Sequence, residues 1–182
     1  MPTVLHTDRL LLREWTAADR DAFAEMSRDP TVMEYLYPGP LSREESDAAA
    51  DRIQAHFQLR GFGFWVLEIP SVTSFAGLVG LAVPRFDARF TPCVEVGWRL
   101  ARGHWGRGYA VEAAAAAMSH GFHHLGLEEI VAMTVPGNVR SWRVMENLGM
   151  KRDPRDDFEH PMLPEGHPLR HHVLYRKKRM RK

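Results

Sequence analysis

The stretch that most constrains this chain is a glycine-rich segment between an alternating apolar run and an alanine-rich run. Apolar and other residues alternate over residues 94–100, which is typical of a strand. Gly103, Gly106 and Gly108 follow, and the alanine-rich run over residues 110–117 predicts a helix. The sequence therefore predicts a strand, a tight loop and the start of a helix in direct succession.

Such a loop is suited to binding an anion. Glycine allows positive φ angles and a close approach of the backbone, and the first N–H groups of a helix have no partner within it. The helix dipole adds about half a positive charge at that end. Arg99, Arg102 and Arg107 add full charges nearby. The segment predicts a site for a phosphate or pyrophosphate, and the alternative is a plain turn with incidental glycines.

Two common phosphate-binding motifs do not match this loop. A dinucleotide fingerprint requires a third glycine three residues after the second, and the residue three positions after Gly108 is Val111. The P-loop of nucleotide hydrolases requires Gly-Lys-Ser or Gly-Lys-Thr, and the sequence contains no such tripeptide. These two kinds of phosphate site are therefore excluded, and the pattern alone leaves either another kind of anion site or a plain turn.

The segment WGRGYAVEA, residues 105–113, resembles the acyl-CoA pyrophosphate loop of the GNAT N-acetyltransferase superfamily. More narrowly, it is similar to the branch that acetylates the N-termini of ribosomal proteins. Further segments resemble this family in the same order along the chain: TDRLLLR at 7–13, Gly97-Trp98, Asn138 with Ser141, and NLGM at 147–150. The resemblance covers about residues 7–176, which is nearly the whole chain.

Helical and strand patterns alternate along the chain. Ser42 and Glu45 have the spacing of a capping box. The first predicted helix starts at Thr16 or Asp19 and ends at Ser27. Three further predicted helices cover residues 42–60, 109–125 and 139–148. The predicted strands are 10–14, 64–69, 75–83, 94–100, 129–135 and 171–176, with a long loop over 152–170. This pattern predicts a mixed α/β (α+β) fold. The resemblance implies a mostly antiparallel twisted sheet of about seven strands with about four helices, whose splayed central strands form an acyl-CoA groove.

Bulk properties predict a single domain over residues 1–182 in a reducing compartment. The length suits one domain, and the lone Cys93 excludes an internal disulfide. No N-terminal signal pattern or long apolar span is present, so we expect a cytoplasmic protein without a membrane contact. Residues 176–182 (RKKRMRK) form a basic tail, for which a weak contact with RNA or the ribosome and a solvated terminus are the two interpretations. The sequence leaves open a monomer or a homodimer.

The resemblance assigns the residues that bind the co-substrate, acetyl-CoA. Backbone N–H groups of the loop would hold the pyrophosphate of coenzyme A, and these belong to Trp105, Gly106, Arg107, Gly108, Tyr109 and Ala110. The backbone of Arg99 and Leu100 would pair with the pantetheine arm. Asn138 would hydrogen-bond the pantetheine amides, although asparagine also favours helix N-caps for local reasons. The side chain of Arg107 either adds charge attraction or points to solvent.

Glu95 is the predicted general base. It lies between Val94 and Val96 on the predicted strand and so points to the opposite face, where Gly97 leaves room. A carboxylate in a partly apolar cleft has a raised pKa, which suits it to accept a proton from an ammonium group. The alternatives are an exposed strand charge or an ion pair with Arg99.

Ser141 is the second predicted catalytic residue, because its hydroxyl could donate a hydrogen bond to the departing sulfur. A local role at a helix N-terminus is the alternative. Many family members carry a tyrosine general acid seven residues after the asparagine that corresponds to Asn138, and this chain has Met145 there. A methionine cannot protonate a thiolate, so Ser141, water or no side chain does so.

Together these features predict an N-acetyltransferase that moves an acetyl group directly from acetyl-CoA to a primary amine in a ternary complex. The amine is either a protein N-terminus or a small molecule, and the resemblance places its recognition in residues 31–63 and 152–170. The alternatives are a transferase for succinyl-CoA or another acyl-CoA, and a non-catalytic acyl-CoA-binding or ribosome-associated protein. No metal site is predicted, since His120, His123 and His124 lack a carboxylate or cysteine at ligand spacing.

Overall fold

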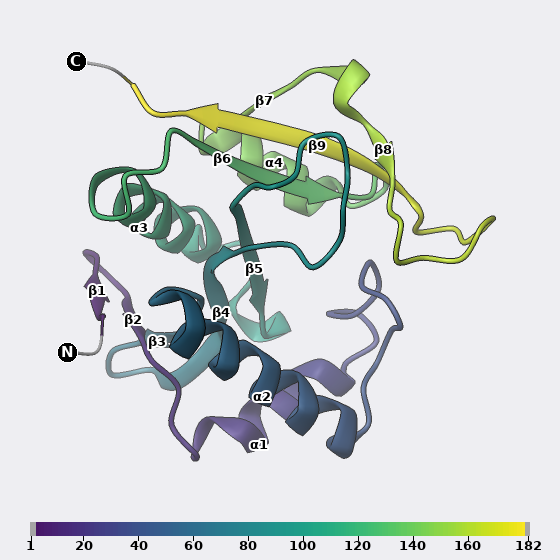
Figure 1. Ribbon diagram of the computed structural model, residues 1–182. Helices are drawn as coiled ribbons and strands as arrows, with labels where there is room; N and C mark the ends of the chain where they lie inside the picture. Colours follow the sequence, from purple (N-terminus) through teal and green to yellow (C-terminus); the bar gives the residue numbers. More distant parts are fainter. Residues whose placement is uncertain (1–2, 181–182) are drawn as a thin grey trace.

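The computed structural model describes residues 3–180 and contains four α-helices and two short 3₁₀ helices in that range (Figure 1). The α-helices are α1 (Asp19–Arg28), α2 (Arg43–Arg60), α3 (Tyr109–His123) and α4 (Val139–Asn147). The 3₁₀ helices are η1 (Arg102–His104) and η2 (Pro154–Asp156). The strands are β1 (Leu5–His6), β2 (Leu11–Arg13), β3 (Phe64–Ile69), β4 (Thr73–Ala82), β5 (Glu95–Leu100), β6 (Glu129–Thr134), β7 (Lys151–Arg152), β8 (Phe158–Glu159) and β9 (His171–Lys178).

The strands form one mostly antiparallel sheet. Their order is β1-β2-β3-β4-β5-β6-β9-β7, and β8 pairs with β9. Only β5 and β6 are parallel neighbours among the described strands. The predicted mixed α/β class is confirmed. The sheet has nine strands where about seven were expected, because β1, β7 and β8 have two residues each, too few for an alternating pattern.

The two central strands separate soon after they meet. Glu95 of β5 and Val131 of β6 form the one register pair between them in the described chain, supported by a 3.0 Å hydrogen bond from Val131 N to Val94 O. On its other edge, β6 pairs with β9 over six residue pairs, from Glu129 to Thr134. The parting leaves one edge of β5 without a neighbouring strand, as expected for a splayed sheet.

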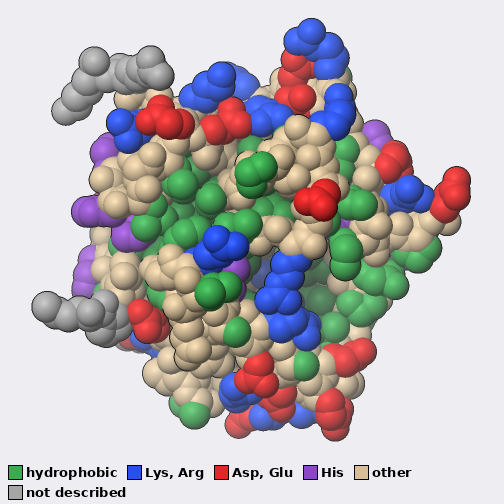
Figure 2. All heavy atoms as spheres, in the orientation of Figure 1, with side chains coloured by type: hydrophobic (Ala, Val, Ile, Leu, Met, Phe, Trp, Pro, Cys, Tyr) green, Lys and Arg blue, Asp and Glu red, His purple; other side chains and the backbone are tan. Residues whose placement is uncertain are grey.

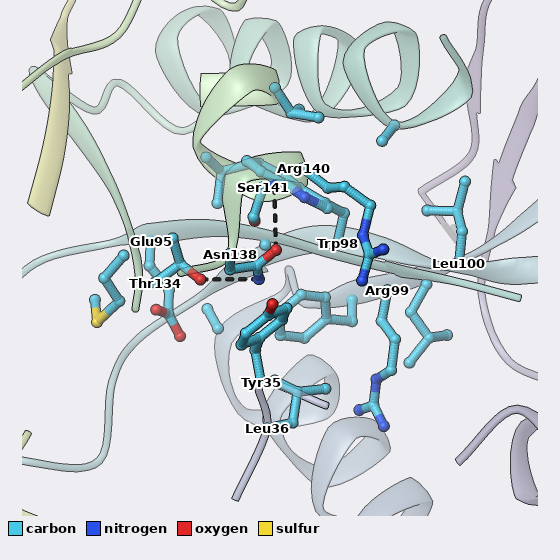
Figure 3. Close-up of a pocket in the computed structure, with 18 of the residues that line it drawn as sticks. Tyr35, Leu36, Glu95, Trp98, Arg99, Leu100, Thr134, Asn138, Arg140 and Ser141 are labelled. Carbon is cyan, nitrogen blue, oxygen red and sulfur yellow. Dashed lines mark hydrogen bonds between the residues drawn. The ribbon is translucent and has the colours of Figure 1, made fainter. Parts of the chain in front are cut away.

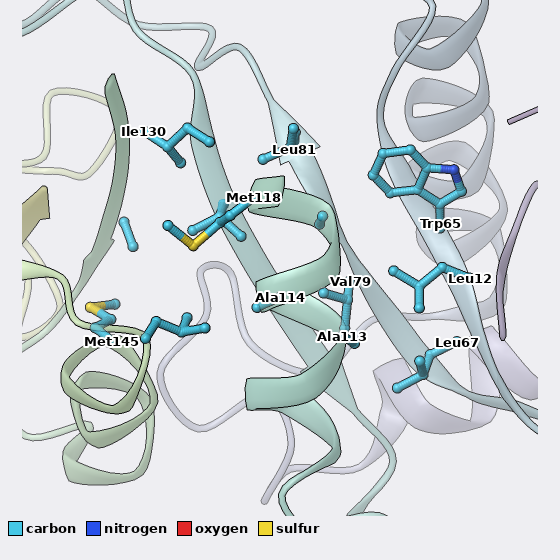
Figure 4. Packing of buried hydrophobic residues seen from close by; sticks show 14 of the residues in the cluster. Leu12, Trp65, Leu67, Val79, Leu81, Ala113, Ala114, Met118, Ile130 and Met145 are labelled. Atoms are coloured by element: carbon cyan, nitrogen blue, oxygen red, sulfur yellow. The ribbon is translucent and has the colours of Figure 1, made fainter. Parts of the chain in front are cut away.

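Alternating side chains divide the core between the two faces of the sheet. On β3, Trp65 and Leu67 belong to the cluster that α3 covers, whereas Val66 belongs to the cluster that α1 and α2 cover. On β4, Val79 faces the first cluster and Leu78 the second. Figure 4 shows Ala113, Ala114 and Met118 of α3 packed beside β4, with Leu12 and Trp65 further along the sheet. Strand alternation therefore creates two distinct sides, one at α3 and one at α1 and α2.

Helix α2 confirms the predicted capping box. The Ser42 side chain accepts from Glu45 N, and the Glu45 side chain accepts from Ser42 N at 2.8 Å. Gly61 ends the helix with φ 74°, in the left-handed region that glycine adopts without strain. None of the helices formed by residues 3–180 is both long and apolar enough to cross a membrane.

The basic run at the C-terminus is partly a strand, which corrects its prediction as a tail. Strand β9 continues to Lys178, two residues beyond the predicted end. Arg176 forms ion pairs with Glu129 at 2.6 Å and Asp156 at 2.7 Å, and Lys177 Nζ donates to Leu148 O at 2.5 Å. Arg176 and Lys177 therefore stabilise the fold. The last two residues of the predicted tail, at 181–182, lie outside the described range.

Candidate active site

A cavity of about 850 Å³ opens where β5 and β6 part. Its walls come from β5, the glycine-rich loop and α4, and from the α1–α2 connection and α2 on the other side. Figure 2 shows a hollow on this face with hydrophobic side chains inside it and Lys or Arg side chains at its edge. Every residue predicted to bind the co-substrate or to act in catalysis lines this cavity except Arg107.

The glycine-rich loop has the geometry that its sequence predicts. Gly106 has φ 72° and Gly108, the N-cap residue of α3, has φ 80°. Both angles lie in the left-handed region, where a side chain would be strained. Within the described chain, no protein group accepts a hydrogen bond from the N–H groups of Gly106, Arg107 or Gly108. These donors therefore stand free at a helix N-terminus, which is a suitable arrangement for a phosphate group.

Trp105 and Arg9 hold the loop in place. The Trp105 indole Nε1 donates to the carbonyl of Leu100 at 2.7 Å and so ties the loop to the end of β5. The Arg9 guanidinium donates to the carbonyl of Arg107 at 3.1 Å and lies 4.9 Å from the centre of the Tyr109 ring. The Arg107 side chain itself is exposed. The loop is thus held before Gly106 by the Trp105 side chain and between Gly106 and Gly108 by the Arg107 carbonyl.

Strand β5 presents one face to the core and the other to the cavity. Val96 and Leu100 belong to the cluster beneath α3. Glu95, Gly97 and Arg99 alternate with them and face α1 and α2. In Figure 3, Glu95 and Arg99 lie on the same side of the strand, with Tyr35 between them. The predicted direction of Glu95 is therefore observed.

Desolvation in the cavity raises the pKa of Glu95 to about 7. No neighbouring charge or hydrogen bond contributes to this shift, and Glu95 and Arg99 form no ion pair within residues 3–180. The carboxylate stands alone in a partly apolar pocket. Its pKa near neutrality allows it both to accept and to release a proton at physiological pH.

Asn138 caps α4. Its Oδ1 accepts from Ser141 N at 3.3 Å, and its Nδ2 donates to Thr134 Oγ1 at 3.0 Å, as Figure 3 shows. The local capping role is thus present. Oδ1 and one Nδ2 hydrogen retain capacity for another partner. The Ser141 hydroxyl makes no hydrogen bond within the described residues and lines the cavity.

Met145 lies on the inner side of α4. It is 1% exposed, belongs to the core cluster beneath α3 and also borders the cavity. The thioether provides an apolar surface there, and the cavity has no proton donor at this position.

Two interactions at the site were not predicted. The Arg9 side chain forms a close ion pair with Glu112, joining the TDR segment to α3. Arg140 lies 4.6 Å from the centre of the Trp105 ring and pairs with Glu34 at 3.0 Å, which links α4 to the α1–α2 connection. Each joins segments about a hundred residues apart, so local patterns could not show them. One indication of the first interaction is present in the sequence: Arg9 and Glu112 each lie in a segment that resembles the GNAT family, at 7–13 and 105–113.

The two segments expected to recognise the acceptor differ in their position. Residues of the first, including Tyr35 and Leu36, line the cavity. The second reaches it indirectly, because the ring of His160 lies 4.5 Å from Phe86, which does line the cavity. Within residues 3–180, no group of three or more His, Cys, Asp or Glu side chains is arranged to hold a metal ion.

Comparison with known proteins agrees with this geometry. A family model described as an acetyltransferase (GNAT) domain matches residues 9–151. The uncharacterized N-acetyltransferase YnaD of Bacillus subtilis is 30% identical over 162 residues, which cover 88% of each chain.

Solved acetyltransferases share the fold. A crystal structure of an acetyltransferase from Agrobacterium tumefaciens superimposes with a TM-score of 0.77 at 28% identity, over 97% of this chain and 95% of that one. The ribosomal-protein-S5-alanine acetyltransferase of Vibrio fischeri has a TM-score of 0.75 at 16% identity, over 97% and 96% of the two chains, which shows a common fold alone. The matched family model, the similar relatives and the splayed sheet with its glycine-rich loop all lead to one conclusion. The chain belongs to the GNAT family of acetyltransferases.

Proposed function

We propose that this enzyme transfers an acetyl group from acetyl-CoA to a primary amine by direct transfer in a ternary complex. The observation that carries the proposal is one cavity that contains both the free N–H groups of the glycine-rich loop and the Glu95 carboxylate. A phosphate-binding end and a proton acceptor in the same space are what an acyl-CoA-dependent amine acylation requires.

The chain's own groups fit coenzyme A. The backbone from Trp105 to Ala110 would hold its pyrophosphate, because the glycines keep the free N–H groups together at the start of α3. The N–H group of Leu100, on the edge of β5 that faces away from β4, would pair with the pantetheine arm, and Asn138 would bond it from α4. The backbone groups of Arg99 point toward Leu78 of β4 instead, which corrects the expectation for that residue. When bound, acetyl-CoA supplies an activated acyl group with a thiolate leaving group.

Glu95 would accept the proton of the incoming ammonium group, directly or through a water molecule. Its pKa near 7 makes the carboxylate available at neutral pH while retaining enough basicity to be effective. Ser141, whose hydroxyl is free, would donate a hydrogen bond to the departing sulfur. Met145 would form an apolar wall beside it without donating a proton.

Initial velocities test the direct transfer. Thiol release is measured while acetyl-CoA and an amine are varied together. We expect intersecting lines in a double-reciprocal plot, because both substrates must be bound before any thiol leaves. Parallel lines, together with a thiol burst without amine, would indicate an acyl-enzyme and contradict the ternary complex.

The acceptor and the donor each have a second candidate. The fold shared with the Vibrio fischeri enzyme, which is named for a ribosomal protein, supports a protein N-terminus as one acceptor. The size of the cavity, about 850 Å³, also admits a larger donor such as succinyl-CoA. Deleting residues 179–182 tests a separate ribosome-associated role. Loss of RNA binding with unchanged acetyl-CoA turnover would support that role, and unchanged RNA binding would contradict it.

A further inference from the structure

The cavity has an excess of positive charge. Among the described residues that line the cavity, Glu95 carries the only carboxylate. The arginines that line it are Arg52, Arg85, Arg99, Arg140 and Arg143. Two of them come from α4, and Arg140 already pairs with Glu34. The other three lie on α2, after β4 and on β5, around the space left for the amine.

Arg99 differs from the other two because it lies inside the cavity. Arg52 and Arg85 are exposed, whereas Arg99 is partly buried against α1. Its Nη1 lies 3.3 Å from Ser27 Oγ and 3.3 Å from Met33 Sδ, both neutral acceptors. A guanidinium has five N–H donors, so most of them have no acceptor in the described chain.

A partly buried guanidinium without a carboxylate partner is costly. Desolvation lowers the pKa of Arg99 to about 10, and no acidic group opposes this shift. Contact with the Phe23 ring, 5.2 Å from the guanidinium carbon, offsets only part of the cost. Buried charges in proteins are normally paired. The missing partner therefore points to a ligand.

We infer that the Arg99 guanidinium binds an anionic group of the acceptor, so that the enzyme acts on amino-carboxylates rather than on simple amines. This inference rests on the proposed amine acetylation. The planar guanidinium can donate two parallel hydrogen bonds to a carboxylate or a phosphate. The pyrophosphate of coenzyme A is the less suitable partner, because Arg99 packs on α1, on the face of β5 opposite α3.

The spacing of Glu95 and Arg99 limits the length of this acceptor. Four residues along one strand separate their Cα atoms by about 13 Å, with both side chains on the same face. An amine near Glu95 and an anion near Arg99 are therefore joined by several bonds. The amine and carboxylate of one α-amino acid lie too close together to reach both groups. An ω-amino acid of roughly six carbons, or a short peptide, spans this distance.

The test compares matched amines by thiol release. The carboxylate series runs from 4-aminobutanoate to 8-aminooctanoate, and each member has its n-alkylamine and its methyl ester as controls. An aminoalkyl phosphate of the preferred length distinguishes phosphate from carboxylate. We expect kcat/KM at least about tenfold higher for the best aminocarboxylate than for its ester or alkylamine, since a charge-assisted hydrogen bond accounts for such a factor.

The variant Arg99→Gln should remove this preference to within about twofold. Arg28→Gln, at an exposed arginine at the end of α1, is the control and should keep the preference. Arg99→Lys, which retains the charge, should keep part of it. If Arg99→Gln does not fold, the inference is still tested by the rates of the wild type and of Arg99→Lys with aminocarboxylates and with their esters and alkylamines.

Equal rates for aminocarboxylates and alkylamines in the wild type would overturn the inference. A raised acetyl-CoA KM in Arg99→Gln with an unchanged acceptor preference would also overturn it and assign Arg99 to the co-substrate. Should no amine react, calorimetric titration of the coenzyme A complex decides, and failure of 6-aminohexanoate to bind overturns the inference. Failure of acetyl-CoA itself to bind would instead reject the proposed function.

Discussion

Arg9 and Glu112 join the first turn of the chain to the helix that follows the glycine-rich loop. Arg9 Nε lies 2.7 Å from Glu112 Oε2, and Arg9 N donates to Glu112 Oε1 at 3.0 Å. The Thr7 hydroxyl donates to the same carboxylate at 2.6 Å. Because Arg9 also donates to the carbonyl of Arg107, this ion pair fixes the loop from outside.

Breaking this pair should weaken coenzyme A binding without touching the ligand. In Arg9→Gln and Glu112→Gln we expect the Kd for acetyl-CoA to rise severalfold, because the loop backbone loses its external support. A double-mutant cycle on the unfolding free energy should give a coupling of about 1 kcal/mol. The exposed Glu25→Gln serves as the matched control. Additive single effects with unchanged affinity would show that the pair does not support the loop.

The conformation of Gly108 should be essential for coenzyme A binding. Its φ of 80° is strained for any residue with a β-branched side chain, so Gly108→Val should shift the free N–H groups. We expect at least a tenfold rise in the Kd for acetyl-CoA, measured by calorimetry. Gly103→Ala is the control, because an added Cβ there meets no atom within 4 Å and φ is not positive. Similar losses in both variants would contradict a specific role for Gly108.

Glu95→Gln should remove the proton acceptor. A positioned general base contributes about 10²- to 10⁴-fold, so we expect kcat to fall within this range with little change in the KM for acetyl-CoA. In the wild type, the rate should rise with pH as the carboxylate loses its proton near pH 7, and the variant should lack this limb. A variant with the wild-type pH profile would exclude Glu95 as the base.

The same substitution should affect stability in a pH-dependent way. The pKa of Glu95 rises from 4.5 to about 7 on folding, so the native state binds more protons than the unfolded state between these values. Wild-type stability contributed by this group is therefore lost as the pH rises through 7. The free energy of unfolding of Glu95→Gln should exceed that of the wild type by up to about 3 kcal/mol at pH 8 and by little at pH 4. Thermal unfolding of both proteins at the two pH values measures this difference in stability. An equal difference at both pH values would contradict the raised pKa of Glu95.

Much of the fold could be predicted because its signals are local. The capping box at Ser42, the alternation along β5 and the glycines before α3 each depend on neighbouring residues, and the structure has all three. The direction of Glu95 followed from the same alternation. The family resemblance then supplied the splayed sheet, which no local pattern predicts.

The remaining features depend on contacts between distant segments. The two residues of β8 pair with β9 across the predicted loop, and no two-residue pattern could indicate this. Arg176 was assigned to a tail from its basic neighbours, although its partners Glu129 and Asp156 come from other parts of the chain. The lack of an acidic partner for Arg99 could not be predicted from the sequence either, because it depends on which acidic side chains the fold places in the cavity.

Titration of the purified protein with acetyl-CoA, followed by thiol release with a panel of amines, tests the central claim most directly. We predict saturable binding of acetyl-CoA that Gly108→Val weakens, and turnover with at least one primary amine that Glu95→Gln lowers at least about 10²-fold. Binding without turnover on any amine would contradict the enzymatic proposal and favour an acyl-CoA-binding protein. Absence of binding would contradict the assignment of the glycine-rich loop as the coenzyme A site.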